Sequence, residues 1–77
     1  MGIMRILDES GDTTLAWHPD DPATIANVRA EFERLVARER WFAFAREAGA
    51  PAADATLVRR FDETAEEIVL TRPLQGG

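Results

Sequence analysis

The pattern of apolar and polar residues at the start of the chain predicts a β-hairpin. Residues 3–8 form an apolar, β-branched run that ends in a polar turn, where Gly11 can adopt a positive φ. Residues 13–18 then alternate between the two faces of a strand, one of which carries Thr13, Leu15 and Trp17. We therefore expect two antiparallel strands joined by a turn at residues 9–12.

A helix is predicted to follow, from residue 22 to about residue 39. Asp21 is a favourable N-cap, and Pro22 suits the first helical position because its missing N–H costs nothing there. Apolar side chains then recur with helical spacing along one side: Ile25, Val28, Phe32, Leu35 and Val36. The charged residues fall mainly on the other side, so we interpret the apolar stripe as the core-facing side of the helix.

The second half of the chain predicts further strands. The aromatics of residues 41–46 favour a buried strand, but no glycine or proline separates them from the helix, so a continued helix is the alternative. We prefer the strand, because a continued helix would place Glu39 and Arg46 on the apolar stripe. Beyond an exposed loop at residues 49–54, two short strands are indicated at 57–61 and 66–72, the second ended by Pro73.

The order of these elements predicts the fold class. A hairpin, a helix and two or three further strands imply one α+β domain over residues 1–77, in which a mixed sheet of four to five strands carries one amphipathic helix on one face. This is a β-grasp-like arrangement, with a flexible tail expected at residues 73–77. Other small α/β sandwiches share the order, so the fold alone decides no function.

Composition and charge exclude several classes of function. The chain has no cysteine, lysine or tyrosine and a single histidine, which leaves almost nothing for a metal site, a Schiff base or a nucleophile. We therefore expect a protein that is not an enzyme and holds no cofactor. Its 14 acidic residues against nine arginines argue against a nucleic-acid partner, and no apolar run approaches the roughly 18 residues of a membrane span. With no secretory leader apparent, we expect a cytoplasmic protein that binds other proteins.

Three minor motifs have structural interpretations. His18-Pro19-Asp20 is the tripeptide of J-domain co-chaperones, but the strand-like residues before it are not the basic helix of those domains, so we interpret it as a strand-to-helix turn. Adjacent carboxylates such as Glu66-Glu67 suggest magnesium, yet neighbouring strand residues point to opposite faces, which favours a solvated surface. The Arg59-Arg60 pair is too small for a nucleic-acid patch in an acidic chain.

The C-terminal end carries the motif that points most directly to a chemistry. The last predicted strand runs out through a proline-stiffened segment into two glycines: Leu70, Thr71, Arg72, Pro73, Leu74, Gln75, Gly76 and Gly77. A carboxylate that is to be adenylated by ATP must enter a narrow channel, which residues without a Cβ allow. With this order of elements and this ending, the chain resembles the ubiquitin-like and sulfur-carrier β-grasp families. Its tail is most similar to that of the small subunit of molybdopterin synthase, with Arg72 in place of the first of two prolines.

The resemblance implies a function that depends on partners. An adenylating enzyme would activate Gly77 with ATP, after which sulfide would give a thiocarboxylate for a sulfur-accepting enzyme, or a thiol and then an amine would give a conjugate with an acceptor protein. Gly76 and Gly77 would form the attachment site, and we expect the activating partner to contact Leu70, Arg72, Pro73 and Leu74. The alternative is a non-catalytic adaptor or accessory subunit that binds through a sheet edge or a Trp17/Trp41 surface, without C-terminal chemistry.

Overall fold

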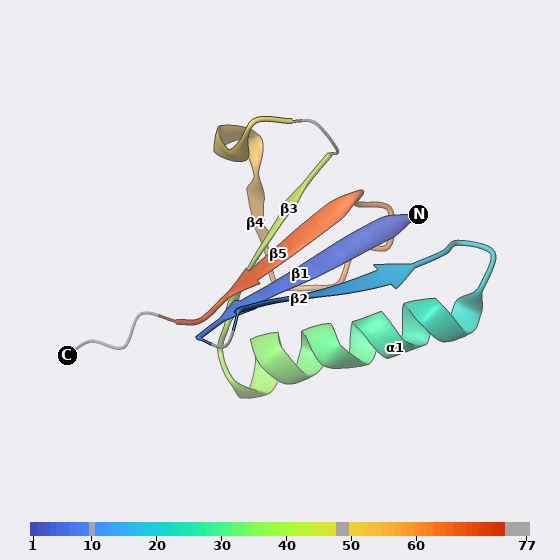
Figure 1. The fold of residues 1–77 in the computed structure, drawn as a ribbon, viewed down its shortest axis with the longest axis horizontal. Helices are drawn as coiled ribbons and strands as arrows, with labels where there is room; N and C mark the ends of the chain where they lie inside the picture. The colour runs from blue at the N-terminus through green and yellow to red at the C-terminus, as the bar shows by residue number, and fades with distance from the viewer. Residues whose placement is uncertain (10, 48–49, 74–77) are drawn as a thin grey trace.

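The computed structural model describes residues 1–9, 11–47 and 50–73, which form a five-stranded sheet and one α-helix (Figure 1). The elements in chain order are β1 (Gly2–Asp8), β2 (Gly11–Trp17), α1 (Pro22–Glu33), a π-helical turn (Arg34–Arg38), β3 (Phe42–Arg46), a 3₁₀ turn (Ala52–Asp54), β4 (Thr56–Val58) and β5 (Glu67–Thr71).

The sheet is mixed, with the strand order β2-β1-β5-β3-β4. β5 lies in the middle, parallel to β1 and antiparallel to β3, while the β1–β2 and β3–β4 pairs are antiparallel. α1 lies across one face of the sheet (Figure 1). The predicted α+β class and the β-grasp-like arrangement are therefore confirmed.

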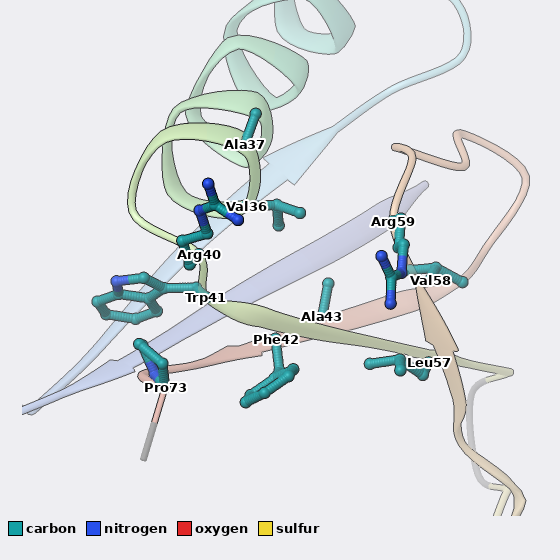
Figure 2. Close-up of a pocket in the computed structure, with 10 residues that line it drawn as sticks. All are labelled: Val36, Ala37, Arg40, Trp41, Phe42, Ala43, Leu57, Val58, Arg59 and Pro73. Atoms are coloured by element: carbon teal, nitrogen blue, oxygen red, sulfur yellow. The ribbon is translucent and has the colours of Figure 1, made fainter. Parts of the chain in front are cut away.

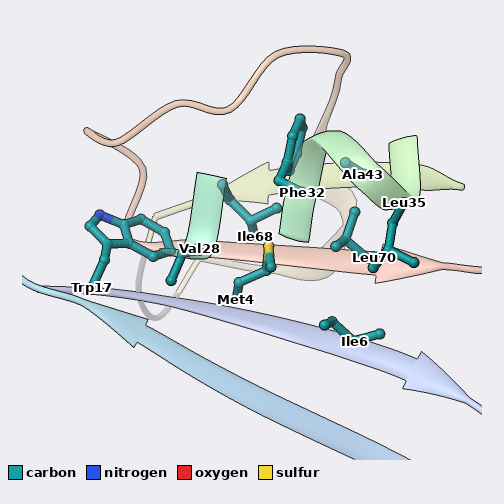
Figure 3. Close-up of a cluster of buried hydrophobic side chains, with 9 residues drawn as sticks. All are labelled: Met4, Ile6, Trp17, Val28, Phe32, Leu35, Ala43, Ile68 and Leu70. Carbon is teal, nitrogen blue, oxygen red and sulfur yellow. The ribbon is translucent and has the colours of Figure 1, made fainter. Parts of the chain in front are cut away.

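The core fills the space between α1 and the inner face of the sheet (Figure 3). Strand alternation places every second side chain of β1 and β5 on this face, and the apolar stripe of the helix packs against them. The buried side chains are Met4, Ile6, Trp17, Val28, Phe32, Leu35, Ala43, Ile68 and Leu70. The helix stripe predicted from the sequence is thus the core-facing side.

The turn from β2 into α1 has the predicted form. The Asp21 carboxylate accepts a hydrogen bond from the Ala23 N–H at 3.2 Å, as an N-cap does, and Pro22 begins the helix. The His18 N–H donates to the Thr24 hydroxyl at 2.8 Å, which ties the strand end to the first helical turn. The His18-Pro19-Asp20 tripeptide therefore belongs to the strand-to-helix turn.

The end of the helix decides between the two interpretations of residues 41–46. The last helical turn widens into a π-helix, and the Trp41 N–H donates to the Leu35 carbonyl at 2.9 Å. Arg40, the residue before Trp41, has a φ of 63°, in the left-handed region that ordinarily favours glycine. This single residue turns the chain out of the helix, so the predicted strand is confirmed as β3 and the continued helix is excluded.

The segment between β3 and β5 differs from the sequence prediction in two places. Part of the predicted loop is a 3₁₀ turn, although Gly49 lies outside the described residues. The strand predicted at 57–61 is β4, which is shorter and ends at Val58. The reason is Phe61, whose ring leaves the sheet to pack edge-on against Trp17 and Phe32, at centroid distances of 5.0 and 5.8 Å.

The loop after Phe61 predicts a measurable dependence of stability on pH. The Thr64 hydroxyl and N–H donate to the Asp62 carboxylate, which lowers the pKa of Asp62 below its ordinary value. A lowered folded-state pKa contributes stability above the unfolded-state pKa, and this contribution is lost as the pH falls through the folded-state value. We expect the urea concentration at the unfolding midpoint to decrease when the pH is lowered below about 4. The decrease should be smaller in Asp62→Asn. An equal fall in both proteins would contradict this assignment.

Candidate functional site

A cluster of charged side chains lies at the start of β5, on the face of the sheet that α1 leaves uncovered. The Glu67 carboxylate accepts from the guanidinium of Arg46 on β3, and it lies 3.3 Å from the Arg5 Nε on β1. Arg46 also donates to the Ala50 carbonyl at 3.2 Å. One carboxylate thus ties three neighbouring strands together, and this end of the outer face carries paired charges.

The other end of the outer face is apolar. Leu7 and Phe42 lie on either side of Thr71 in the strand register, and Phe44 lies between Val69 and Leu57. Leu7, Phe42 and Leu57 are 40, 45 and 49% exposed, which is high for such large side chains. We call this set the outer-face patch: Leu7, Phe42, Phe44, Leu57 and Val69.

The chain leaves the sheet next to this patch. Because β1 and β5 are parallel, both end at the same edge, where the Arg72 guanidinium lies 2.7 Å from the Glu9 carboxylate. Both side chains are exposed, so the ion pair adds little stability, but it joins the chain after β5 to the turn after β1. Pro73 follows, half-buried, at the end of the described chain.

The partner-contact residues predicted from the sequence have different environments. Leu70 is 0% exposed and faces α1, so its side chain packs in the core and is not available to a partner; the outward positions beside it are Val69 and Thr71. Arg72 and Pro73 lie at the strand end as expected. Leu74, Gly76, Gly77 and the predicted flexibility of the tail beyond Pro73 lie outside the described residues.

The adaptor surface predicted at Trp17 and Trp41 is wrong in one of its two residues. Trp17 is buried, and its indole N–H donates to the Glu63 carbonyl at 3.1 Å. It points to the helix side of the sheet because it shares that face with Leu15 on β2. Trp41 is half-buried and borders a groove between the end of the helix and the strands β3 and β4.

This groove lies where the β3–β4 ladder ends, and its volume is about 570 Å³ (Figure 2). Val36 and Ala37 reach it from the end of the helix, and Ala43 and Val58 are the last residue pair of the β3–β4 ladder. Arg40 and Trp41 lie on one side of Ala43, and Arg59 lies beside Val58 on the other (Figure 2). Pro73, Phe42 and Leu57 complete the lining, so the groove adjoins the outer-face patch.

Sequence reasoning missed both surfaces. Residues 42–46 alternate aromatic and alanine, and this signal was interpreted only as a buried strand. The alanines face the helix, where small side chains let it approach, and Phe42 and Phe44 therefore point outward. The groove has no local signal, because Arg40 and Arg59 are brought together only by the β3–β4 pairing.

The described residues bring together no three carboxylate or imidazole side chains that could hold a metal ion. No helix within the described ranges is long and apolar enough to cross a membrane. Comparison of the chain with models of protein families, with curated proteins and with solved structures finds no match.

Proposed function

We propose that this protein is a ubiquitin-like modifier or sulfur carrier of the cytoplasm, whose C-terminal Gly77 carboxylate is activated by a partner adenylating enzyme. One observation supports this proposal above the others. Of the four large apolar side chains that are exposed in the described chain, Leu7 and Phe42 flank the last residue of β5, and Leu57 shares a groove with Phe42 and Pro73. A partner that docks on the outer-face patch is therefore placed beside the segment that leads to the diglycine.

The chemistry requires little from this chain beyond its carboxylate. An oxygen of the Gly77 carboxylate attacks the α-phosphorus of ATP, the bond to the β-phosphate breaks, and pyrophosphate leaves with the formation of an acyl-adenylate. A sulfur nucleophile then attacks the acyl carbon and AMP leaves. Sulfide gives a thiocarboxylate, whereas an enzyme thiol gives a thioester that an amine converts to an amide. Glycine at both final positions removes the Cβ atoms that would obstruct approach to the nucleotide.

Deleting Gly77 separates this function from folding. We expect the free energy of unfolding to change by less than about 0.5 kcal/mol, since terminal residues ordinarily contribute little to stability. Pyrophosphate exchange with ATP, catalysed by the activating enzyme of the native host, should be abolished. Gln75→Ala is the matched control in the same tail and should retain exchange. A truncated chain that still supports exchange would overturn the proposal.

The mass of the protein isolated from its native host distinguishes the two forms of the proposal. Replacement of one carboxylate oxygen by sulfur would identify a sulfur carrier, whereas covalent attachment to a second protein through Gly77 would identify a modifier. A free carboxylate under all growth conditions would count against both forms.

The same patch also favours a second candidate function, that of an adaptor without C-terminal chemistry. Phe42 and Leu57 present exposed apolar surface whatever follows Pro73. Phe42→Ser and the deletion of Gly77 distinguish the two candidates. A carrier loses partner function in both variants, whereas an adaptor loses it only in Phe42→Ser.

A further inference from the structure

The arginines of this chain fall into two groups. Five of the nine form ion pairs: Arg5, Arg29, Arg34, Arg46 and Arg72. The other four form none with the residues that the structure describes: Arg38, Arg40, Arg59 and Arg60. These four arginines thus have no carboxylate partner among the described residues, although the chain carries 14 acidic residues.

Two of the unpaired arginines border the groove at the end of the β3–β4 ladder. Among the described residues that line it, only Arg40 and Arg59 are charged, and they reach it from opposite sides (Figure 2). Between them the lining is apolar, formed by side chains such as Val36, Trp41 and Leu57. The groove therefore offers an apolar floor between two positive charges.

Arg40 is held at this place at a cost in backbone energy. Its φ of 63° lies in the left-handed region, where a side chain bearing a Cβ is less favourable than glycine. Helices commonly end with glycine at this position. A cation near the helix C-terminus gains some energy from the helix dipole, but that gain does not account for Arg59, which follows β4.

The same geometry argues against a compact polyanion such as a free phosphate. The groove lies at the C-terminal end of the helix, where the dipole disfavours the two charges of a phosphate more than the single charge of a carboxylate. The backbone N–H of Trp41 already donates to the Leu35 carbonyl, so this backbone group is not available to bind an anion. A ligand must therefore gain its affinity from the apolar floor and from two separated guanidinium groups. Guanidinium groups pair well with carboxylates in two-point geometry.

We propose that this groove binds an acidic and apolar peptide segment of a partner protein, with an apolar side chain on the floor and flanking carboxylates on Arg40 and Arg59. β4 is an edge strand whose one neighbour is β3, so no further strand of the described chain lies beyond the groove on that side. The proposal does not depend on the chemistry of the C-terminal tail. Binding should persist when Gly77 is deleted, which keeps a failure of this proposal distinct from a failure of the proposed function.

The probe is a six-residue peptide, capped at both ends, with leucine and valine at its centre and glutamates on both flanks. We expect the wild-type full chain to bind it, with amide and indole shifts in two-dimensional NMR concentrated at Trp41, Val58 and Arg59. Arg40→Gln and Arg59→Gln should each weaken binding about fivefold. Arg38→Gln is the matched control, because it removes the same charge from the same helix end without lining the groove, and should leave affinity within about twofold.

A second variant separates binding from folding. Arg40→Gly removes the guanidinium and also the Cβ that makes the left-handed backbone unfavourable. It should therefore bind the peptide as weakly as Arg40→Gln while its thermal midpoint stays at or above that of the wild type. A merely structural role for Arg40 would lower the midpoint and leave the affinity unchanged.

Several results would overturn the proposal. These are equal binding of a peptide with glutamines in place of glutamates, affinity that does not change between low and high salt, and shifts confined to other surfaces. Tighter, Arg40-dependent binding of a single-stranded oligonucleotide or of phosphatidylserine vesicles would assign the groove to a nucleic acid or a membrane instead. Concentration-dependent dimerisation that is lost in Arg59→Gln would assign it to a second copy of this acidic chain.

Discussion

Phe32→Ala is expected to leave the domain largely unfolded at room temperature. The Phe32 ring is 1% exposed in the centre of the core and packs edge-on against Phe61 at 5.8 Å. Removing a buried aromatic ring costs about 3–5 kcal/mol, and a domain of this size has a total stability near the lower end of the usual range, about 5 kcal/mol. Circular dichroism during urea titration should show a midpoint close to zero denaturant.

The matched control is Phe42→Ala, the same substitution on the outer face. Phe42 is 45% exposed, so its truncation removes less buried area and leaves no enclosed cavity. We expect a cost of about 1 kcal/mol or less and a clear unfolding transition. Equal losses in the two variants would contradict the assignment of the core to the helix side of the sheet.

The first half of the fold could be predicted from sequence because its signals are local. Period-two alternation, an N-cap followed by proline, and a helical stripe each depend on residues close together in the chain. The same stripe predicts which side chains are buried, and Val28, Phe32 and Leu35 are. The structure adds mainly the position of β5 between β1 and β3, which depends on contacts distant in sequence.

The end of the helix, the position of Phe61 and the groove depend on contacts between residues distant in sequence, which leave no local signal. The π-helical turn ends at Arg38, and the chain leaves the helix at Arg40, a residue type that rarely adopts a positive φ, so no glycine or proline marks the boundary. Phe61 is of a residue type that favours strands, but its contacts with Trp17 and Phe32 take it out of the sheet. The groove unites Arg40 with Arg59 in the same way, through strand pairing. Propensity describes a residue's immediate neighbours, and these positions are decided by tertiary packing.

Burial also separates the two roles that the sequence assigned to the last strand. Leu70 and Arg72 are two positions apart and therefore lie on the same side of the extended chain. Leu70 is covered by the helix, whereas Arg72 lies beyond the end of the sheet and pairs with Glu9. The residues of this segment that solvent reaches are therefore the outward Val69 and Thr71 and, after β5, Arg72 and Pro73, while the inward residues hold β5 in place.

Gly2→Ala is expected to be among the most destabilising single-methyl changes in this chain. Gly2 lies directly opposite Trp17 in the β1–β2 register, and the indole covers it. A Cβ at Gly2 would lie 2.0 Å from the nearest indole carbon, far inside van der Waals contact. The indole cannot move aside easily, because it is packed against Phe61 at 5.0 Å and hydrogen-bonded to the Glu63 carbonyl. We expect a cost of about 3 kcal/mol, at the upper end for overpacking.

Gly11→Ala is the matched control, since the reason for glycine there is different. Gly11 has a φ of 126°, and nothing lies within 4 Å of a Cβ built on it. Its substitution costs only backbone strain, about 1–2 kcal/mol. The loss in Gly2→Ala should depend on the indole, and the loss in Gly11→Ala should not.

A double-mutant cycle with Trp17→Leu tests that distinction. In the Trp17→Leu background the ring that meets the new methyl is absent, so Gly2→Ala should add little further loss, and the coupling energy should reach about 2 kcal/mol. Gly11→Ala should cost the same in both backgrounds. Urea titrations in sucrose, which favours the folded state, keep the weaker variants measurable. Additive losses for Gly2→Ala and Trp17→Leu would show that the indole does not lie over Gly2, and with it the packing of β2 against the core would have to be revised.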